Sequence, residues 1–351
     1  MLPRFLIYGA NGYVGEAAAR LAVEQGLEPV LAGRNETAVA SLAAELGLEH
    51  RICALDDAAG LDRALKDVPL VLHLAGPYQT TARPMVEACL RAGAHYLDIT
   101  GEIPVLDWLS RRDEEAKAKG VMLLPAAGFD VVPTDCLAAH LQRRLPTATR
   151  LTLGFHSVGP AGLPPGTQRT GIELLHHADV VRRGGRLVTP DPSAATRTMD
   201  FGNGSVDATR ITWGDVFTAY HTTGIPDIEV YTVLSAQARR ALNLAKRLRP
   251  LFHFAPLRAI LRLGVQPGPT AERRAATVTH VWGEVADDVG RIATARLHGP
   301  EAGLAWTTRA ALSVVRRALA GEVLPGFQTP AGAYGADLVL ESEGVTREDV
   351  G

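Results

Sequence analysis

Three glycines near the amino terminus have the spacing of a phosphate-binding loop. They belong to the stretch 9–15, Gly-Ala-Asn-Gly-Tyr-Val-Gly, which follows the apolar run Phe5–Tyr8. In such a loop Gly9 permits a tight turn, Gly12 lets the backbone approach a pyrophosphate, and Gly15 lets helix and strand pack closely. The N–H groups and the dipole at the start of the following helix favour an anion. We therefore expect a dinucleotide to contact the loop residues Gly9, Asn11, Gly12, Tyr13, Val14 and Gly15.

The residues at the end of the second expected strand indicate which dinucleotide binds. About 20 residues beyond the glycine loop, an NAD site carries Asp or Glu for the ribose hydroxyls. This chain has Gly33, Arg34 and Asn35 there, and no acid. The planar guanidinium of Arg34 can pair with a 2′-phosphate, whereas its structural alternative is a solvent-facing residue at a helix start. The sequence therefore favours NADP(H) over NAD(H), with Gly33 and Arg34 at the cofactor.

Further residues that could do chemistry follow the later strands of the same expected sheet. In an open α/β sheet, ligands bind beyond the carboxyl ends of the strands. The turn after the fourth strand consists of Ala75, Gly76 and Pro77. We expect this turn to lie near the nicotinamide, and Asp56, after the third strand, to reach the adenine edge. Because the cofactor supplies the hydride, the protein must handle one proton. The candidate proton carriers are Tyr78, Glu102, Asp130, Tyr220 and His221.

Each candidate proton carrier has a structural alternative. Tyr78 can simply stack against the cofactor. Glu102 and Asp130 can cap helices or hold loops through backbone N–H groups. Tyr220 and His221 can belong to the core of a second domain. Tyr78 is the first choice for the proton, because it directly follows the Gly-Pro turn expected at the nicotinamide.

Short apolar runs alternate with helical stretches over the first 135 residues. The runs are Phe5–Tyr8, Pro29–Ala32, Leu70–Leu74, Tyr96–Ile99 and Val121–Leu124. They lack polar alternation, which is typical of strands in a parallel sheet covered on both faces. Gly47 and Gly93 are placed to end helices between the runs, and Pro84 is placed to begin one. The pattern predicts an α/β fold with a Rossmann-type doubly wound parallel sheet.

The pattern changes after Pro133. A helix is expected over Asp135–Arg144, followed by strand-like runs between Gly- and Pro-rich loops. The runs Thr277–Val285 and Arg291–Leu297 flank a short turn and predict an antiparallel hairpin. We therefore expect three segments: a Rossmann dinucleotide-binding domain (1–135), an inserted α+β substrate domain with a mixed or antiparallel sheet (136–302), and a C-terminal helix and tail returning to the first domain (303–351).

Composition and missing motifs exclude several classes of function. The 351 residues carry a net charge of −2, so the overall charge points neither to nucleic acid nor to an acidic membrane as a partner. No apolar run approaches the roughly 20 residues of a transmembrane segment. Three separated cysteines are typical of a reducing compartment, and we expect a cytoplasmic protein. The adjacent His176 and His177 are expected to diverge, so no metal site is predicted. The basic segment Arg239–Arg262 is the one shift in composition, and its role is open.

Segments along nearly the whole chain resemble those of saccharopine dehydrogenase-like oxidoreductases, especially the bacterial trans-acting enoyl reductases. They are GANGYVG (9–15), AGR (32–34), AGPY (75–78), AHYLDITGE (94–102), AAGFDVVPTD (126–135), GTQRTGIELL (166–175), WGDVFTAYHTTGIPDIEVY (213–231) and PGFQTPAGAYG (325–335). The resemblance implies a Rossmann domain, an inserted α/β domain and a C-terminal segment that returns to the first. It also implies an NADP-dependent oxidoreductase.

Motifs and resemblance together favour an NADPH-dependent reductase that acts on an activated C=C or C=N bond of a small molecule. A lipid- or polyketide-like substrate fits the resemblance, and a homodimer is left open. The alternative is a non-catalytic NADP(H)-binding sensor or scaffold protein. A polar proton donor within reach of the nicotinamide, in a closed pocket, would distinguish the enzyme from the sensor.

Overall fold

The computed structural model describes residues 4–191 and 195–350. This part of the chain divides into two compact units. The first comprises residues 4–136 and 304–343, and the second comprises residues 137–191, 195–303 and 344–350.

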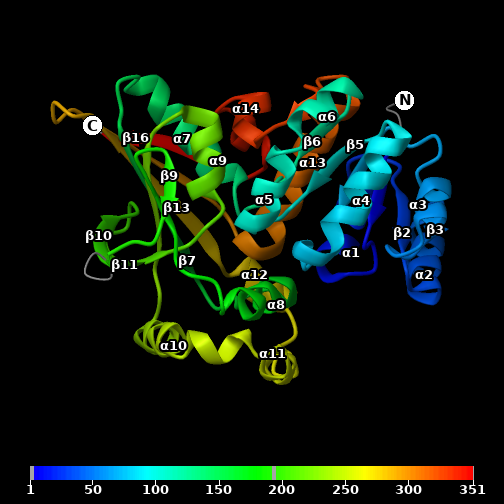
Figure 1. Cartoon of the computed structure of the whole chain (residues 1–351), viewed down its shortest axis with the longest axis horizontal. Coiled ribbons are helices and arrows are strands. Elements are labelled where there is room, and N and C mark those ends of the chain that lie inside the picture. The colour runs from blue at the N-terminus through cyan, green and yellow to red at the C-terminus, as the bar shows by residue number, and fades with distance from the viewer. Residues whose placement is uncertain (1–3, 192–194, 351) are drawn as a thin grey trace. The chain divides into compact units, whose positions relative to one another are not determined.

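The seven strands of the first unit form one parallel sheet in the order β15-β6-β5-β4-β1-β2-β3 (Figure 1). They are β1 (Leu6–Tyr8), β2 (Val30–Gly33), β3 (His50–Ile52), β4 (Leu70–His73), β5 (His95–Asp98), β6 (Met122–Leu124) and β15 (Gly326–Phe327). Every residue of β1, β2, β4 and β6 is buried, as expected for a sheet covered on both faces. The predicted doubly wound sheet is therefore confirmed.

Helices follow most of these strands. They are α1 (Tyr13–Glu24), α2 (Glu36–Leu46), α3 (Ala58–Ala64), α4 (Tyr78–Ala92), α5 (Ile103–Ser110), α6 (Asp113–Ala118), α13 (Thr307–Leu319) and α14 (Pro330–Tyr334), with the short η4 (Leu338–Glu341). The expectation that Pro84 begins a helix is wrong, because Pro84 lies inside α4. Backbone N–H groups of Tyr78 and Gln79 are bound by a carboxylate, which allows the helix to start six residues earlier than the proline.

The glycine loop fixes how α1 packs on β1. Gly9 adopts a φ of +84°, in the left-handed region that favours glycine. A Cβ built on Gly15 would lie 2.1 Å from the carbonyl oxygen of Gly9 and 2.9 Å from the Cα of Ala10. Because both obstacles are backbone atoms, α1 can approach β1 this closely only without a side chain at Gly15.

The second unit contains a mixed sheet with the main order β10-β11-β12-β7-β13-β14-β16, while β8 pairs with β12 and β9. Its strands are β7 (Arg150–Val158), β8 (Val181–Arg183), β9 (Arg186–Val188), β10 (Thr196–Asp200), β11 (Ser205–Ile211), β12 (Asp227–Thr232), β13 (Val278–Ala286), β14 (Ile292–Pro300) and β16 (Thr346–Val350). β12 and β7 are parallel, whereas the other neighbours are antiparallel. The predicted hairpin is confirmed as β13 and β14.

The other elements of the chain include α7 (Val132–Arg144), which contains the passage from the first unit to the second, and η3 (Ala302–Trp306), which contains the passage back. Between them lie α8 (Pro165–Leu174), α9 (Asp215–Thr223), α10 (Ala236–Arg247), η2 (Arg249–His253), α11 (Ala255–Arg262) and α12 (Ala271–Ala275).

The carboxyl-terminal residues differ from the expected return of 303–351 to the first domain. Residues 304–343 do group with the first unit, but residues 344–350 group with the second. The reason is backbone pairing, because β16 adds to the edge of the second sheet by antiparallel hydrogen bonding to β14.

Replacing Gly15 by alanine tests the packing of α1 on β1. The new methyl group would overlap backbone that cannot rotate away, so we expect a destabilisation of at least about 1–3 kcal/mol and a lower melting temperature. Gly171→Ala in α8 is the matched control, because a Cβ there meets nothing within 4 Å. Circular dichroism melts of both variants give the comparison. A Gly15→Ala melt that coincides with the wild type would contradict this packing.

Candidate active site

The glycine loop leaves the start of α1 without a side-chain cap. Gly12 is the N-cap residue, and it has no side chain that could accept a hydrogen bond from the first turn. The N–H groups of Gly9 and Ala10 both donate to the carbonyl oxygen of Ala32, at 2.8 and 3.1 Å, which holds the loop against β2. The structure therefore places the expected cofactor residues in the turn after β1 and at the start of α1: Gly9, Asn11, Gly12, Tyr13, Val14 and Gly15.

Arg34 and Asp56 follow the second and third strands, and their charges act on the buried phenol of Tyr8 at the end of the first. The Tyr8 hydroxyl donates to the carbonyl oxygen of Cys53 at 3.1 Å. Burial, with a smaller contribution from Cys53, raises the pKa of Tyr8 to about 12, while Arg34 lowers it and Asp56 raises it. Arg34 and Asp56 are exposed, so their charges are accessible to a ligand.

The residues flanking Arg34 have local roles. Gly33 ends β2, and a Cβ on it would lie 3.3 Å from the Oδ1 of Asn11. The Asn35 side chain accepts a hydrogen bond from the N–H of Ala38 at 3.1 Å and caps α2. Gly33 therefore lies next to the glycine loop, and Asn35 is occupied by the helix.

The turn after β4 packs against the glycine loop. A Cβ on Gly9 would lie 2.9 Å from the Cβ of Ala75 and 3.0 Å from its backbone nitrogen. Gly76 and Pro77 continue the turn, joined by a cis peptide bond, and Pro77 is the N-cap residue of α4. The turn expected at the nicotinamide and the loop expected at the pyrophosphate are thus direct neighbours.

Glu102 holds the start of α4. Its Oε1 accepts the N–H of Tyr78 at 2.9 Å, and its Oε2 accepts the N–H of Gln79 at 3.0 Å. The side chain is buried, and its own N–H donates to the Thr100 hydroxyl at 3.1 Å. A carboxylate is favoured there by the helix dipole and by charge-assisted hydrogen bonds. Glu102 therefore caps the start of α4, which is the role that the sequence offered as the alternative to proton transfer.

The hydroxyl of Tyr78 is directed into the protein. It donates to the carbonyl oxygen of His73 at 3.2 Å, and the His73 ring meets the Tyr78 ring edge to face, with centroids 5.5 Å apart. Burial, together with the nearby carboxylates of Asp98 and Glu102, holds the pKa of Tyr78 well above its ordinary value. At neutral pH this phenol keeps its proton.

Asp98 and His73 are two buried polar residues that the sequence analysis did not select. Asp98 Oδ1 accepts N–H groups of Thr100 and Ala126, both at 2.9 Å, and Oδ2 accepts the Tyr96 hydroxyl at 2.7 Å. Burial raises the pKa of Asp98 to about 6 and lowers that of His73 to about 3. Both residues could have been selected from the sequence, because each is a charged or polar residue in an otherwise apolar strand.

Asp130 lies in the turn after β6 and is partly exposed. A Cβ on Gly101 would lie 3.1 Å from its Oδ2, so the carboxyl group packs on the backbone that follows β5. Burial, and then the negative charge of Glu102, raise the pKa of Asp130 to about 7. The structure therefore brings Tyr78, Glu102 and Asp130 together at the ends of three adjacent strands.

Tyr220 and His221 belong to α9 of the second unit and are not part of this cluster within the first unit. The guanidinium of Arg182 lies 4.1 Å from the centroid of the Tyr220 ring. The exposed His221 stacks on Phe217, with ring centroids 4.6 Å apart. Both side chains have packing partners inside their own unit, but neither is buried in its core, so the expected alternative of core residues is met only in part.

His176 and His177, in the turn that follows α8, do not diverge as expected. The ring centroids of His176 and His177 lie 4.2 Å apart, and His253 lies 5.2 Å from His176. Both residues lie beyond the end of the helix, so the angular separation of neighbouring helical side chains does not apply to them. Within residues 4–191 and 195–350, no group of three or more His, Cys, Asp or Glu side chains could hold a metal ion.

Residues 5–124 match the family model of the saccharopine dehydrogenase NADP-binding domain. The matched range covers six of the seven strands of the parallel sheet, the glycine loop and Arg34. The match agrees with the cofactor class expected from the sequence.

Curated relatives match less than half of the chain. The human saccharopine dehydrogenase-like oxidoreductase is 28% identical over an alignment of 194 residues. The alignment covers 48% of this chain and 44% of that protein. The trans-acting enoyl reductase of Mycobacterium leprae is 30% identical over 148 residues, which are 40% of this chain and 35% of that protein. The chain thus spans less than half the length of the curated relatives it matches.

A solved structure extends the similarity in fold. Saccharopine dehydrogenase (L-Glu forming) from Saccharomyces cerevisiae aligns with 99% of this chain and 100% of its own, at a TM-score of 0.69 and 14% identity. Such identity speaks for the fold alone. Together with the family model, these findings agree with the resemblance: residues 5–124 match a saccharopine dehydrogenase NADP-binding domain, and part of the chain is similar to saccharopine dehydrogenase-like oxidoreductases and trans-acting enoyl reductases.

Proposed function

We propose that the chain is an NADPH-dependent reductase of an activated C=C or C=N bond in a small molecule. One observation carries the proposal. A helix start without a side-chain cap, at Gly12, and a carboxyl group with a pKa near neutrality, on Asp130, lie at the same edge of one parallel sheet. The first suits a dinucleotide phosphate, and the second suits proton transfer.

The residues present fit NADPH. The N-cap position of α1 carries no side chain, and a Cβ on Gly12 would lie 3.1 Å from the Gly9 carbonyl oxygen, on the loop that would meet the phosphates. The exposed guanidinium of Arg34 would hold a 2′-phosphate. Asp56 would accept a hydrogen bond at the adenosine end, and Ala75, Gly76 and Pro77 would face the nicotinamide. Bound NADPH supplies a hydride.

Asp130 is our choice for the proton carrier. Near pH 7 about half of its carboxyl groups carry a proton, which can be given to substrate and replaced from water. Tyr78 is a weaker choice than the sequence indicates, because its hydroxyl is bound to the His73 carbonyl and its pKa is far above neutrality. Glu102 sets the start of α4 and raises the pKa of Asp130, so we assign it a positioning role.

The names of the relatives bear on the substrate. An enoyl reductase acts on a C=C bond, which supports an enoyl, lipid- or polyketide-like substrate for this chain. The three cysteines, Cys53, Cys89 and Cys136, are free and buried. Free thiols suit the cytoplasm, where we place the reaction.

The non-catalytic alternative, an NADP(H)-binding sensor or scaffold, is favoured by one observation. Tyr78 and Glu102 both make hydrogen bonds that hold the fold, as they would in a protein that only binds. The two functions differ in what Asp130 does, and the second experiment below addresses that difference.

Arg34→Ala tests the cofactor preference. Loss of a partly exposed Arg–phosphate pair removes about 1–3 kcal/mol, so we expect NADPH to bind about 5- to 150-fold more weakly and NADH to bind unchanged. Calorimetric titration with each dinucleotide gives the affinities. Arg111→Ala, at an exposed arginine that follows α5, is the matched control and is expected to bind both as the wild type does. Equal affinity of the wild type for NADPH and NADH would refute the preference.

Asp130→Asn tests the proton carrier. As a general acid, Asp130 acts in its protonated form, so wild-type turnover is expected to fall as the pH rises through about 7. The amide cannot transfer the proton, and turnover is expected to drop by about 10²–10⁴-fold and to lose this pH dependence. Steady-state rates from pH 5.5 to 8.5 give both quantities.

Tyr78→Phe serves as the comparison for Asp130→Asn. It removes the hydroxyl and its hydrogen bond to the His73 carbonyl, and turnover is expected to stay within a few-fold of the wild type. Should Tyr78→Phe abolish turnover while Asp130→Asn retains it, the assignment of the two residues is reversed. NADPH affinity is expected to change little in either variant.

A further inference from the structure

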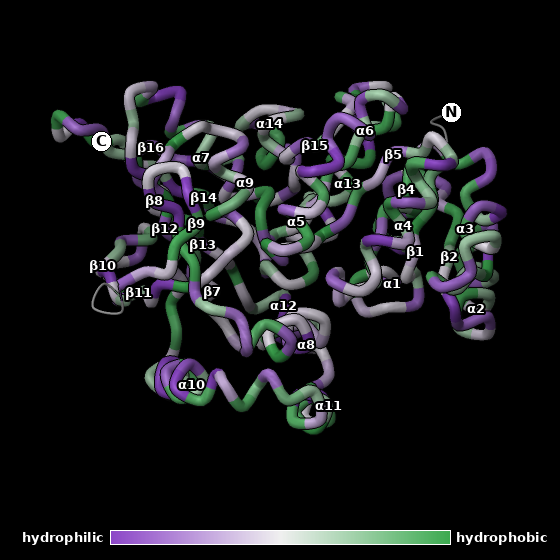
Figure 2. Tube along the Cα trace, in the orientation of Figure 1, coloured by the Kyte–Doolittle hydropathy of each residue, from purple (hydrophilic) through white to green (hydrophobic). Residues whose placement is uncertain are grey.

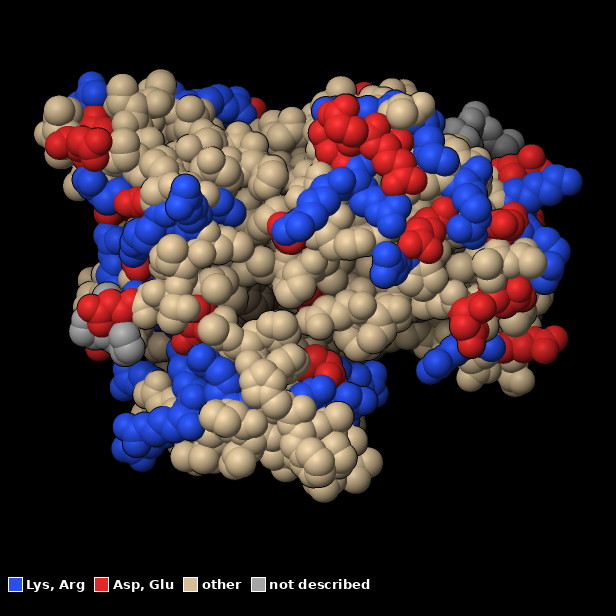
Figure 3. Space-filling model, in the orientation of Figure 1, with Lys and Arg blue, Asp and Glu red and all other residues tan. Residues whose placement is uncertain are grey.

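The segment formed by α10, η2 and α11 in the second unit, residues 235–264, carries an unbalanced positive charge. It contains the basic stretch Arg239–Arg262 noted in the sequence, and from here on we call residues 235–264 the basic segment. Between residues 230 and 271 the chain has no Asp or Glu, and it has seven Lys or Arg residues: Arg239, Arg240, Lys246, Arg247, Arg249, Arg258 and Arg262. Figure 3 shows lysine and arginine side chains gathered over α10, beside a largely uncharged area over α11.

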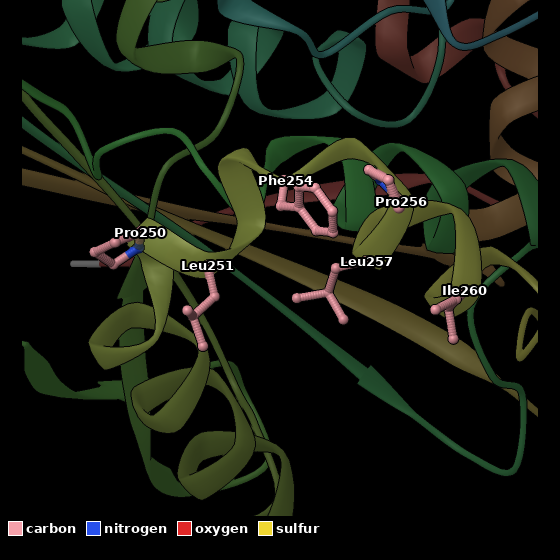
Figure 4. A pocket seen from close by; sticks show the side chains of 6 residues that line it. All are labelled: Pro250, Leu251, Phe254, Pro256, Leu257 and Ile260. Atoms are coloured by element: carbon pink, nitrogen blue, oxygen red, sulfur yellow. The ribbon is translucent and has the colours of Figure 1, made fainter.

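The same segment exposes large apolar side chains. Phe254 is 66% exposed, Ile260 is 63% exposed and Leu263 is 86% exposed. A shallow apolar hollow of about 400 Å³ lies along η2 and α11. Its lining residues are Pro250, Leu251, Phe254, Pro256, Leu257 and Ile260, and Figure 4 shows Leu251, Leu257 and Ile260 projecting on the same side of the ribbon. Figure 2 shows the green of hydrophobic residues along α11 and a mixture with purple along α10.

Three of the cations fasten the basic segment to the rest of its unit. Lys246 pairs with Asp179 at 2.7 Å. Arg262 and Arg258 both pair with Glu173 of α8, at 2.6 and 3.4 Å. These ion pairs attach one side of the basic segment to the rest of the second unit and leave its other side exposed.

The remaining cations lie beside the apolar residues. Arg239, Arg240, Arg247 and Arg249 form no ion pair with any residue in the described ranges 4–191 and 195–350. Arg240 is four residues before Leu244 and Arg247 three residues after it, so all three lie on one face of α10. Leu244 is 57% exposed. An exposed apolar side chain between arginines fits a helix that lies in a membrane interface.

We propose that the basic segment binds the surface of a membrane rich in anionic lipids. Leu251, Phe254, Ile260 and Leu263 enter the boundary between headgroups and acyl chains, while Arg240 and Arg247 reach the phosphates. Binding is peripheral, because no helix in the described residues is long and apolar enough to cross a bilayer. The inference does not rest on the proposed reductase activity, since every residue in it lies outside the first unit.

The positive charge of the basic segment favours an anionic membrane over a second copy of the chain as its partner. A twofold contact between two basic segments would face arginines with arginines and supply no acid to pair them. An anionic bilayer supplies both the negative charge and an apolar interior, which together match the two features of the exposed side.

Vesicle flotation of the full chain tests the proposal. Two vesicle types are used, phosphatidylcholine alone and phosphatidylcholine with about one third phosphatidylglycerol. We expect the wild type to float with the anionic vesicles and to bind phosphatidylcholine at least about tenfold more weakly. Raising the salt from about 0.1 M to about 0.5 M is expected to weaken the anionic binding, because the exposed charges are screened.

Two double variants separate the charge from the apolar contact. Arg240→Glu/Arg247→Glu and Phe254→Ser/Ile260→Ser are each expected to lower partitioning to anionic vesicles by at least about tenfold. The matched controls are Arg186→Glu in β9 and Val289→Ser in the β13–β14 turn, an exposed arginine and an exposed valine of the same unit. Both controls are expected to float as the wild type does, and circular dichroism melts verify that all variants fold.

Three outcomes overturn the proposal. The first is a wild-type chain that stays at the bottom of the gradient with anionic vesicles, and the second is a pair of controls that lose binding as strongly as the double variants. The third is a vesicle-free dimer, seen by light scattering, that becomes a monomer in Phe254→Ser/Ile260→Ser. That result would assign the apolar side to a second copy of the chain.

Discussion

The carboxylate of Asp98 joins the ends of neighbouring strands inside the first unit, and the candidate active site depends on it. One oxygen binds the backbone N–H groups of Thr100 and Ala126, which begin the turns after β5 and β6, and the other binds the Tyr96 hydroxyl. The carbonyl oxygen of Asp98 also accepts the N–H of Ala127 at 2.7 Å. Glu102 lies four residues beyond Asp98 and Asp130 four residues beyond Ala126. Both therefore take their positions from turns that Asp98 holds, and burial of that carboxylate is offset by its hydrogen bonds.

The starts of the helices at this edge of the sheet explain where a dinucleotide phosphate would bind. Asn35 caps α2, Asp57 caps α3, and Glu102 binds the first two N–H groups of α4. Each of these starts is already supplied with a side-chain oxygen, and two of the three carry a negative charge that would repel a phosphate. At α1 the cap residue is Gly12, which has no side chain. The same arrangement that directs an anion to α1 places a negative charge beside Asp130, which raises its pKa towards neutrality.

Local patterns predicted most of the first unit, because they encode what each segment buries. Uninterrupted apolar runs located β1 and β4 to within one residue, and the left-handed glycines Gly47 and Gly93 end α2 and α4 as expected. The edge strand β3 carries no such run, since two of its three residues are exposed. Long-range contacts had no local signal: Glu102 reaches α4 across 24 positions, and this contact, not Pro84, sets where the helix starts. The roles of the site residues stay predictions, since sequence patterns show which groups can transfer a proton and not which one does.

The central claim is that this chain transfers a hydride from NADPH to an unsaturated bond while its own carboxyl group supplies a proton. The most direct measurement uses NADPH deuterated at one C4 position, in each of its two forms, with a panel of enoyl thioesters and cyclic imines. Mass spectrometry of the products then counts the deuterium transferred. The account predicts a reduced product in at least one class, labelled from only one of the two deuterated forms, because a fixed site presents one face of the nicotinamide. Saturable NADPH binding, with no label in any product and no NADPH oxidation, would contradict the account and assign the chain a binding role.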